Sequence, residues 1–296
     1  MPQVQSTAHA NAGRLLGVLG LSLSVLLIEV VGGLASNSLA LLADAGHVLT
    51  DVGGITLALV AIWIASRPAS DARTFGYLRL EVLAAAANAV LLFGVAAFIL
   101  YEAWRRLSEP PVVASGLMLG VALVGLLANG VALWLLGSAQ AHSLNLRGAY
   151  LEVAGDLAGS AAVILAAIII ALTGWAAADA LASIVVAVLI LPRTWALLRE
   201  ATDVLLEATP RGVRMDEVRA HILDAPGVAD VHDLHVWTIT SGLNVVSAHV
   251  VLRPGVDASG VLDYLCECLS GDFDIEHSTF QLETADRRRV EERSHA

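Results

Sequence analysis

Long apolar runs alternate with short polar segments over the first 200 residues of the chain, and the pattern then changes. A run of 18 or more apolar residues with few charges predicts a helix that crosses a membrane. The segments between the runs are rich in Gly, Pro and Ser, and the pair Pro110 and Pro111 ends any helix that reaches it. The six runs are 15–36, 40–66, 80–103, 113–137, 147–172 and 176–198.

From Ala201 onward the apolar runs give way to a shorter, mixed pattern. Two stretches have apolar residues at helical spacing, and three alternate between apolar and polar residues as strands do. Their order along the chain is α-β-β-α-β, which predicts a small α+β domain. The predicted elements are helix 211–227, strand 228–240, strand 245–252, helix 257–271 and strand 277–283.

Charge is concentrated in this C-terminal part. Hydrophobic residues make up 57% of the chain, and the formal net charge is −11. Residues 201–296 contribute −9 of that charge, from 17 acidic residues against 8 arginines. An acidic surface argues against nucleic acid as a partner and is compatible with metal cations.

The arginines predict how the chain is oriented in the membrane. If the N-terminus is cytoplasmic, the outer loops contain only Arg105 and Arg106. Both termini are therefore expected in the cytoplasm, where Cys266 and Cys268 stay reduced and form no disulfide framework. The arginines of the inner loops are Arg14, Arg67, Arg73, Arg79, Arg147, Arg193 and Arg199.

Four ionisable residues interrupt the second and fifth apolar runs. Such a residue in a membrane helix costs about 2.5–3.5 kcal/mol, so it indicates function by default. Residues four apart lie on one face of a helix, so His47 lies near Asp51, and Glu152 near Asp156. One imidazole and three carboxylates can surround a divalent cation, and four such ligands suit tetrahedral zinc.

The charge of this ligand set also favours a metal. Three carboxylates repel one another in a low dielectric unless a dication lies between them. When the metal leaves, protons can replace it on the acids and on the imidazole, whose reference pKa is about 6.5. A site that alternates between metal and protons is the core of an antiporter. The alternative, pairing of each polar group with a neighbour in the bundle, explains two pairs at equal spacing less well.

Two further acids in the apolar runs have two interpretations each. Asp44 could be an outer metal ligand or a cap at the start of its helix, and we favour the cap. Asp179 could attract cations or cap the last helix, and the sequence does not decide between these roles. Glu29 is expected to hydrogen-bond between helices.

Four stretches make the chain resemble the cation diffusion facilitator family of metal/proton antiporters. They are SLALLADAGHVLTDVGG, RTFGYLRLEVLAAAAN, LNLRGAYLEVAGDLAGS and, in the tail, GVADVHDLHVWTITSGLNVVSAHVVL. The resemblance implies a homodimer of six-helix subunits whose tail is a cytoplasmic domain of ferredoxin-like fold. It also implies the transport site, which consists of His47, Asp51, Glu152 and Asp156.

The expected fold is therefore an α-helical membrane protein with six transmembrane helices plus a small cytoplasmic α+β ferredoxin-like domain. Residues 1–14 are expected to form a cytoplasmic N-terminal tail and 15–200 the transmembrane domain. Residues 201–286 are expected to sense metal and dimerise, and 287–296 to form a disordered tail.

Two features depart from the pattern of many relatives. Glu152 stands where they have histidine, and a charged oxygen in place of a neutral nitrogen makes the site harder. We therefore expect an ion range that extends beyond Zn²⁺ to Co²⁺, Cd²⁺ or Mn²⁺. The loops also lack histidines that relatives often carry: position 78 is Leu, and the loop after the fourth run has only His142. A metal site in the 66–79 loop would retain only Asp71.

The tail strands contain a second set of candidate ligands. His232 and His235 are three residues apart, so in a regular strand they face opposite sides and cannot share a metal unless the strand is bulged. By resemblance, His232, His249 and Glu283 bind a metal near the dimer interface. The alternative is a set of polar side chains on a solvated strand face. His277 and the two cysteines are weaker candidates.

The resemblance also implies a charge pair between Arg79, at the start of the third span, and Glu207, just after the sixth. In relatives such a pair links membrane helices of the dimer, and here it is a candidate hinge. Ordinary surface pairing is the alternative.

These features predict a proton-coupled antiporter of the inner membrane that exports divalent metal cations, with Zn²⁺ the first candidate, by alternating access. Zn²⁺ would also occupy the tail as a regulatory ion. A metal-selective channel or uniporter without proton coupling is the alternative. An enzyme is not expected, because HExxH is absent and four ligands leave no open position for an activated water. The expected partners are a second copy of the chain, divalent ions, protons and the lipid bilayer, but no nucleic acid.

Overall fold

The computed structural model describes residues 3–65, 67–137, 144–240 and 242–291. The chain forms two compact units, each containing segments that are distant in sequence. The first unit comprises Met1–Leu59 and Ala87–Leu198, and the second comprises Val60–Ala86 and Arg199–Ala296.

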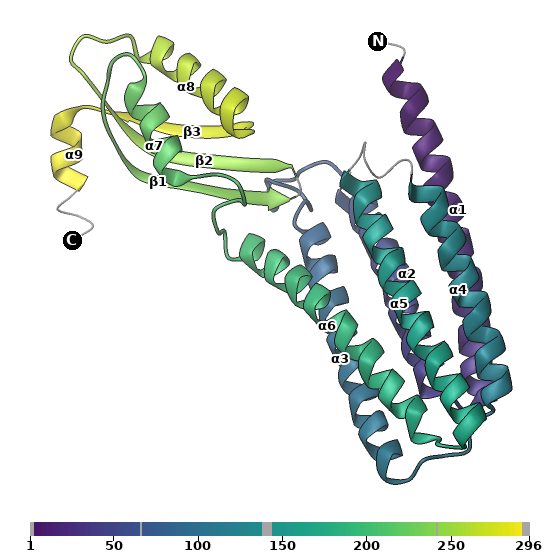
Figure 1. Cartoon of the computed structure of the whole chain (residues 1–296). Coiled ribbons are helices and arrows are strands. Elements are labelled where there is room, and N and C mark those ends of the chain that lie inside the picture. Colours follow the sequence, from purple (N-terminus) through teal and green to yellow (C-terminus); the bar gives the residue numbers. More distant parts are fainter. Residues whose placement is uncertain (1–2, 66, 138–143, 241, 292–296) are drawn as a thin grey trace. The chain divides into compact units, whose positions relative to one another are not determined.

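Six long helices occupy the N-terminal two thirds of the chain, one for each predicted apolar run (Figure 1). Among the described residues, four helical stretches are long and apolar enough to cross a membrane: Leu80–Ser108, Ser115–Leu135, Val153–Thr173 and Ala177–Leu205. The first two helices contain shorter described apolar stretches, Gly20–Ser36 and Leu39–Thr50. The helices are α1 (Gln3–Ser36), α2 (Leu39–Ala65), α3 (Leu80–Ser108), α4 (Ser115–Gly137), α5 (Leu144–Thr173) and α6 (Ala177–Leu205).

Residues with positive φ separate consecutive helices at two tight turns. Asn37, with φ of 58°, lies between α1 and α2, and Gly174, with φ of 72°, follows α5. The Gly174 N–H donates to the carbonyl of Ile170 at 2.8 Å, which satisfies one of the last carbonyls of the helix. Asn and Gly are the residues that adopt this left-handed conformation most readily.

Glycines allow the membrane helices of the first unit to pack closely. A Cβ atom at Gly32 of α1 would collide with Val121 of α4. A Cβ atom at Gly159 of α5 would lie 3.0 Å from Oδ1 of Asp44 on α2. Close packing of this kind is what associates helices in lipid, where no hydrophobic effect drives them together.

The C-terminal domain is a three-stranded mixed sheet with two helices on one face (Figure 1). The central strand β2 pairs antiparallel with β1 and parallel with β3. Ile222 of α7, together with Leu265 and Leu269 of α8, packs on the strands in one buried core. The order α-β-β-α-β agrees with the predicted one. The elements are α7 (Met215–Asp224), β1 (Val228–Thr240), β2 (Leu243–Leu252), α8 (Ala258–Phe273) and β3 (His277–Glu283).

A sixth element of this domain, a helix, corrects the prediction that the chain is disordered from residue 287. The last strand is followed by a short helix, α9 (Ala285–Glu291). Asp286 lies in its first turn, where a negative charge is favourable, and Arg288 forms an ion pair with Asp230 of β1. The stretch was missed because it has no periodic apolar residues. Residues 292–296 lie outside the described part of the chain.

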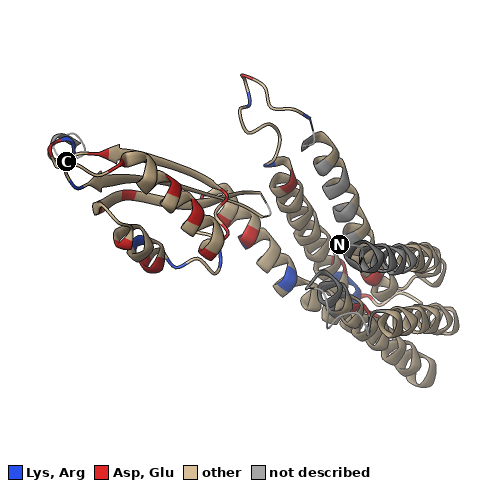
Figure 2. Ribbon diagram, turned by 90° about the horizontal axis from the view of Figure 1, so that it is seen from above, with Lys and Arg blue, Asp and Glu red and all other residues tan. Residues whose placement is uncertain are grey.

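Acidic residues are scattered over the helices and strands of the C-terminal domain, whereas few charged residues mark the described parts of the long helices (Figure 2). This distribution follows the charge balance of the sequence. It makes the few ionisable groups of the membrane helices conspicuous.

Candidate metal centres

The first candidate centre lies between α2 and α5. His47 Nε2 of α2 lies 3.4 Å from Asp156 Oδ1 of α5, and each side chain is only 11% exposed. Asp51 lies one helical turn after His47 on α2, and Glu152 one turn before Asp156 on α5. The side chains of Asp51 and Glu152 lie outside the described residues. The structure thus brings together one member of each predicted pair, while the roles of the other two remain predictions.

A cavity of about 160 Å³ adjoins this pair. At roughly 30 Å³ per water molecule, it has room for an ion that keeps part of its hydration shell. The cavity is polar where Asp44, His47 and Asp156 meet, and Arg193 of α6 also lines it. The remaining lining residues are Gly155, Gly159, Val186, Leu189 and Ile190.

Asp44 does not cap its helix, so the favoured interpretation of this residue is wrong. The helix begins at Leu39, and Ser38 is the residue that accepts from a first-turn amide, Leu41 N–H, at 3.2 Å. Asp44 is instead 2% exposed inside the bundle and accepts a hydrogen bond from Ser160 Oγ at 3.4 Å. It therefore lies beside the predicted ligands, as an outer ligand would.

Asp179 does act as a cap, but for another helix than its own. Its carboxylate accepts hydrogen bonds from Ser38 Oγ at 2.5 Å and from the backbone N–H groups of Leu39 at 2.7 Å and Ala40 at 3.2 Å. Arg106 Nη1 of α3 lies 3.8 Å from the same carboxylate. Asp179 thus fixes the first turn of α2, the helix that carries His47, to α6. Sequence reasoning missed this role because the partners lie about 140 positions away.

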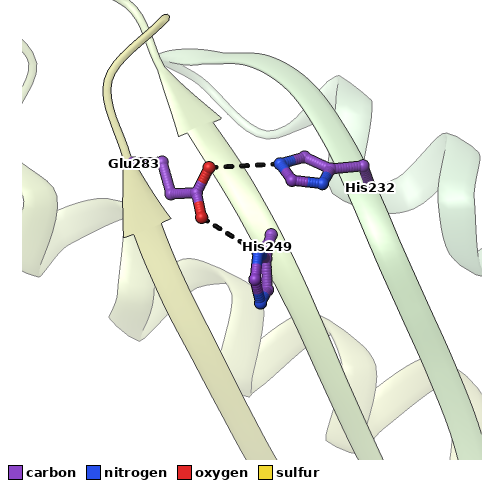
Figure 3. Close-up of side chains that lie close together, drawn as sticks. All are labelled: His232, His249 and Glu283. Carbon is purple, nitrogen blue, oxygen red and sulfur yellow. Dashed lines mark hydrogen bonds and ion pairs between the residues drawn. The ribbon is translucent and has the colours of Figure 1, made fainter. Parts of the chain in front are cut away.

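The second candidate centre lies on the sheet face opposite α7 and α8 (Figure 3). Glu283 of β3 reaches His232 Nε2 of β1 at 3.1 Å and His249 Nδ1 of β2 at 2.9 Å. We call these three residues the tail cluster. Potential ligand atoms of all three lie within 4.8 Å of one another, and no other group of three or more such side chains is found among the described residues.

A bulge in β1 determines which side chains join the tail cluster. The pairing of β1 with β2 shifts between His232 and His235, and Asp233 there has φ of 49°. The extra residue leaves both histidines off the core face. His235 Nε2 contacts Asp233 Oδ1 at 2.9 Å rather than joining the cluster, and the other carboxylate oxygen lies 3.7 Å from His249 Nε2. The sequence allowed His235 to share a metal with His232 only if the strand is bulged. The bulge is present, but His235 does not join the tail cluster.

Glu283 is the residue that most needs a positive partner in this cluster. Its side chain is 1% exposed, and besides the two histidines it accepts a hydrogen bond from Gln281 Nε2 at 2.6 Å. A buried carboxylate is costly unless it is paired and hydrogen-bonded. Gln281, two residues before Glu283 on the same strand face, was overlooked, although strand periodicity places it there.

The remaining candidates are not members of either centre. Arg79 Nη2 and Glu207 Oε1 are 2.7 Å apart, with side chains 39% and 57% exposed, so the predicted pair forms within one chain. Cys266 is exposed and Cys268 partly buried. Burial raises the pKa of both thiols, with Asp263 adding to this effect at Cys266 and Asp272 at Cys268, which disfavours the thiolate that metals bind.

The sequence matches two family models that together cover most of the chain. Residues 15–206 match the cation efflux transmembrane domain, and residues 210–285 match the cytoplasmic domain of cation efflux proteins. The chain is also similar along most of its length to curated transporters, each of which it covers by more than four fifths.

Three of these relatives illustrate the similarity. The metal cation efflux system protein CzcD of Cupriavidus metallidurans is 50% identical over 90% of this chain and 85% of its own. The cadmium, cobalt and zinc/H⁺-K⁺ antiporter of Bacillus velezensis is 42% identical over 88% of this chain and 84% of its own. The zinc transporter ZitB of Escherichia coli is 42% identical over 92% of this chain and 88% of its own. This chain therefore belongs to the cation diffusion facilitator family, whose members are multi-pass membrane transporters that carry metal cations and are not enzymes.

Proposed function

We propose that this protein exports divalent metal cations, Zn²⁺ first among them, from the cytoplasm in exchange for protons. The observation that carries the proposal is the contact between His47 and Asp156, which joins two buried metal-binding groups from two membrane helices beside a cavity. Asp51 and Glu152 complete the proposed ligand set. Two relatives support the same assignment. One is described as a zinc transporter, and the other as an antiporter of cadmium, cobalt and zinc that exchanges H⁺ and K⁺.

The exchange follows from the chemistry of the proposed ligands. Imidazole and carboxylate groups bind a metal only when deprotonated, so metal and protons compete for the same atoms. On the cytoplasmic side the deprotonated site takes the metal as its substrate. On the other side, protons that bind His47 and the acids release the metal. A shift between two accessibilities of one site then converts a proton gradient into metal export.

Transport in sealed vesicles tests this function. Purified protein is reconstituted with a pH dye and a metal dye inside the vesicles, and Zn²⁺, Co²⁺, Cd²⁺ and Mn²⁺ are added in turn. We expect each accepted ion to enter while protons leave. Metal entry that moves no protons would replace the antiporter with a channel or uniporter.

Glu152→His is expected to narrow the ion range. Replacing a charged oxygen by a neutral nitrogen softens the site and lowers its charge, so Zn²⁺ transport should persist while Co²⁺ and Mn²⁺ transport falls. The measurement is the ratio of initial Co²⁺ to Zn²⁺ rates in the same vesicles, with Glu152→Gln as the control that removes charge without adding an imidazole. A Co²⁺ to Zn²⁺ ratio in Glu152→His equal to or above that of the wild type would contradict the role assigned to Glu152.

We also propose that the tail cluster binds a regulatory divalent metal. Two imidazoles and one carboxylate are donors that suit Zn²⁺, and a dication would balance the buried charge of Glu283. His232, His249 and Glu283 would hold the ion, which would tie three strands together by one ligand each.

Glu283→Gln is expected to weaken zinc binding at the tail cluster by at least about tenfold, since an amide oxygen is a poor substitute for a carboxylate ligand. Calorimetry on the full-length protein measures this, with Asp156→Asn in the background to silence the membrane centre. Glu276→Gln, which changes an exposed acid just before β3, is the matched control. Equal zinc affinity in both variants would remove Glu283 from the ligand set.

The assembly and orientation follow the family resemblance. We propose a homodimer in the inner membrane with both termini in the cytoplasm. The arginine-poor outer loops support the orientation. The match of residues 210–285 to a cytoplasmic domain agrees with it.

A further inference from the structure

Within the second unit, the short segment that leads into α3 touches the C-terminal sheet. We call it the 75–81 segment. Glu81 Oε2 accepts a hydrogen bond from Thr240 Oγ1 at 2.8 Å. The Phe75 ring meets the His277 ring edge to face, with ring centroids 5.7 Å apart. These two contacts have no part in either proposed metal centre.

The character of these contacts argues for specific docking rather than chance proximity. Thr240 is 9% exposed, so its hydroxyl needs a partner, and a hydroxyl–carboxylate hydrogen bond is of the stronger, charge-assisted kind. Phe75 is 48% exposed and lies outside the core clusters formed by the described residues, yet its ring contacts the His277 ring of the sheet. The ion pair of Arg79 with Glu207 lies between these contacts in sequence, which gives three contacts within seven residues.

The docking contacts and the tail cluster lie at opposite ends of the same strands. Thr240 is the last residue of β1, eight residues after His232. His277 is the first residue of β3, six residues before Glu283. At about 3.3 Å per residue, the two sites are roughly 20–26 Å apart along the sheet. A metal bound by the tail cluster would therefore cross-link the strands at one end. The other end of the same strands carries Thr240 and His277, which contact the 75–81 segment.

We infer that the 75–81 segment is the docking surface for the far end of the C-terminal sheet, and that metal in the tail cluster strengthens this docking. One ligand from each strand limits how the strands move relative to one another, so less freedom is left to lose when Thr240 and His277 dock. The inference rests on the proposed tail site. Because α3 continues from this segment into its membrane-spanning stretch, metal-dependent docking would hold the start of that helix when cytoplasmic metal is high.

Tryptic cleavage tests the docking directly. Trypsin cuts after Arg79, which lies within the 75–81 segment, and after Arg73, which lies two residues before it. The full-length protein, again with Asp156→Asn so that zinc reaches only the tail, is digested with and without Zn²⁺. We expect zinc to slow cleavage at these two sites by at least about fivefold, the lower end of typical coupling between sites.

Thr240→Val and Phe75→Leu should each abolish most of this protection. By reciprocity, Thr240→Val should also lower the zinc affinity of the tail by the same factor. Thr238→Val is the matched control, because it removes a hydroxyl from the same strand that donates to Asn244 Oδ1 rather than to Glu81. Wild-type protection in both docking variants would overturn the inference.

Two failures can be told apart. If calorimetry finds Glu283-dependent zinc binding but zinc leaves the cleavage rates unchanged, the tail site stands and the coupling is wrong. If no Glu283-dependent binding is found, the tail site itself is wrong. The docking is then tested in the absence of zinc. If the 75–81 segment is a docking surface, trypsin must cleave the Thr240→Val variant at Arg73 and Arg79 faster than it cleaves the Thr238→Val variant.

Discussion

Replacing Asp156 with asparagine is expected to reduce metal-driven proton movement in vesicles by about 100-fold or more. The change removes a charged ligand from a buried site, and even residues that only support a ligand typically contribute 10–100-fold to metal affinity. It also leaves His47 facing an amide that neither balances a dication nor exchanges a proton. The measurement is the initial rate of both dye signals after addition of Zn²⁺, and Asp51→Ala should give the same loss.

Glu109→Gln is the matched control for charge, because Glu109 is exposed just beyond the end of α3. Equal amounts of folded protein in the vesicles must be verified for each variant. Full transport by Asp156→Asn would mean that the contact between α2 and α5 is architecture, and the proposed transport site would have to be abandoned.

Asp179→Ala is expected to destabilise the membrane unit by about 3–5 kcal/mol, the range for removing one member of a buried charged pair. The substitution leaves the Ser38 hydroxyl and the first two backbone N–H groups of α2 without their acceptor. It also leaves the Arg106 guanidinium without one of its carboxylate partners. Inside a membrane, backbone groups without a partner are especially costly because no water replaces the lost bonds.

Thermal unfolding in detergent, followed by tryptophan fluorescence, measures this loss as a lowered melting temperature. Asp203→Ala provides the comparison, because it removes an acid of the same helix whose side chain is 45% exposed and pairs with Arg199 at the surface. We expect the melting temperature of Asp179→Asn to lie between those of Asp179→Ala and Asp203→Ala, since its amide oxygen can still accept a hydrogen bond. A melting temperature of Asp179→Ala equal to that of Asp203→Ala would show that the cap contributes little.

The sequence sufficed for features that depend on local pattern. Each long helix follows from a run of apolar residues, and the strands of the tail follow from alternation around turns. The contact between His47 and Asp156 could also be predicted, because two pairs of ionisable residues at the same spacing in two membrane helices indicate a shared binding site. The tail cluster came from resemblance rather than from spacing, and the structure places its three side chains together.

Features that depend on contacts distant in sequence could not be predicted. Whether Asp44 caps a helix depends on where that helix begins, and Ser38 sets the start six residues earlier. The partner of Asp179 is fixed only when α6 packs beside α2. The bulge at Asp233 arises from the pairing of β1 with β2, since nothing in the local alternation requires an extra residue. The helix at Ala285–Glu291 contains only two apolar residues, Ala285 and Val290, so no periodic apolar pattern predicts it.

The cap on α2 has a mechanical consequence. With its first turn fixed at Leu39, α2 is a lever whose fulcrum lies eight residues from His47, or about 12 Å at 1.5 Å per residue. A tilt of about 10° around that end would shift His47 by about 2 Å and Asp51, about 18 Å from the fulcrum, by about 3 Å. Such a displacement is enough to break a 3.4 Å contact with Asp156 while the fixed end stays in place. Small rotations at a clamped end could thus open and close the ligand sphere, with most of the movement on the side away from the cap.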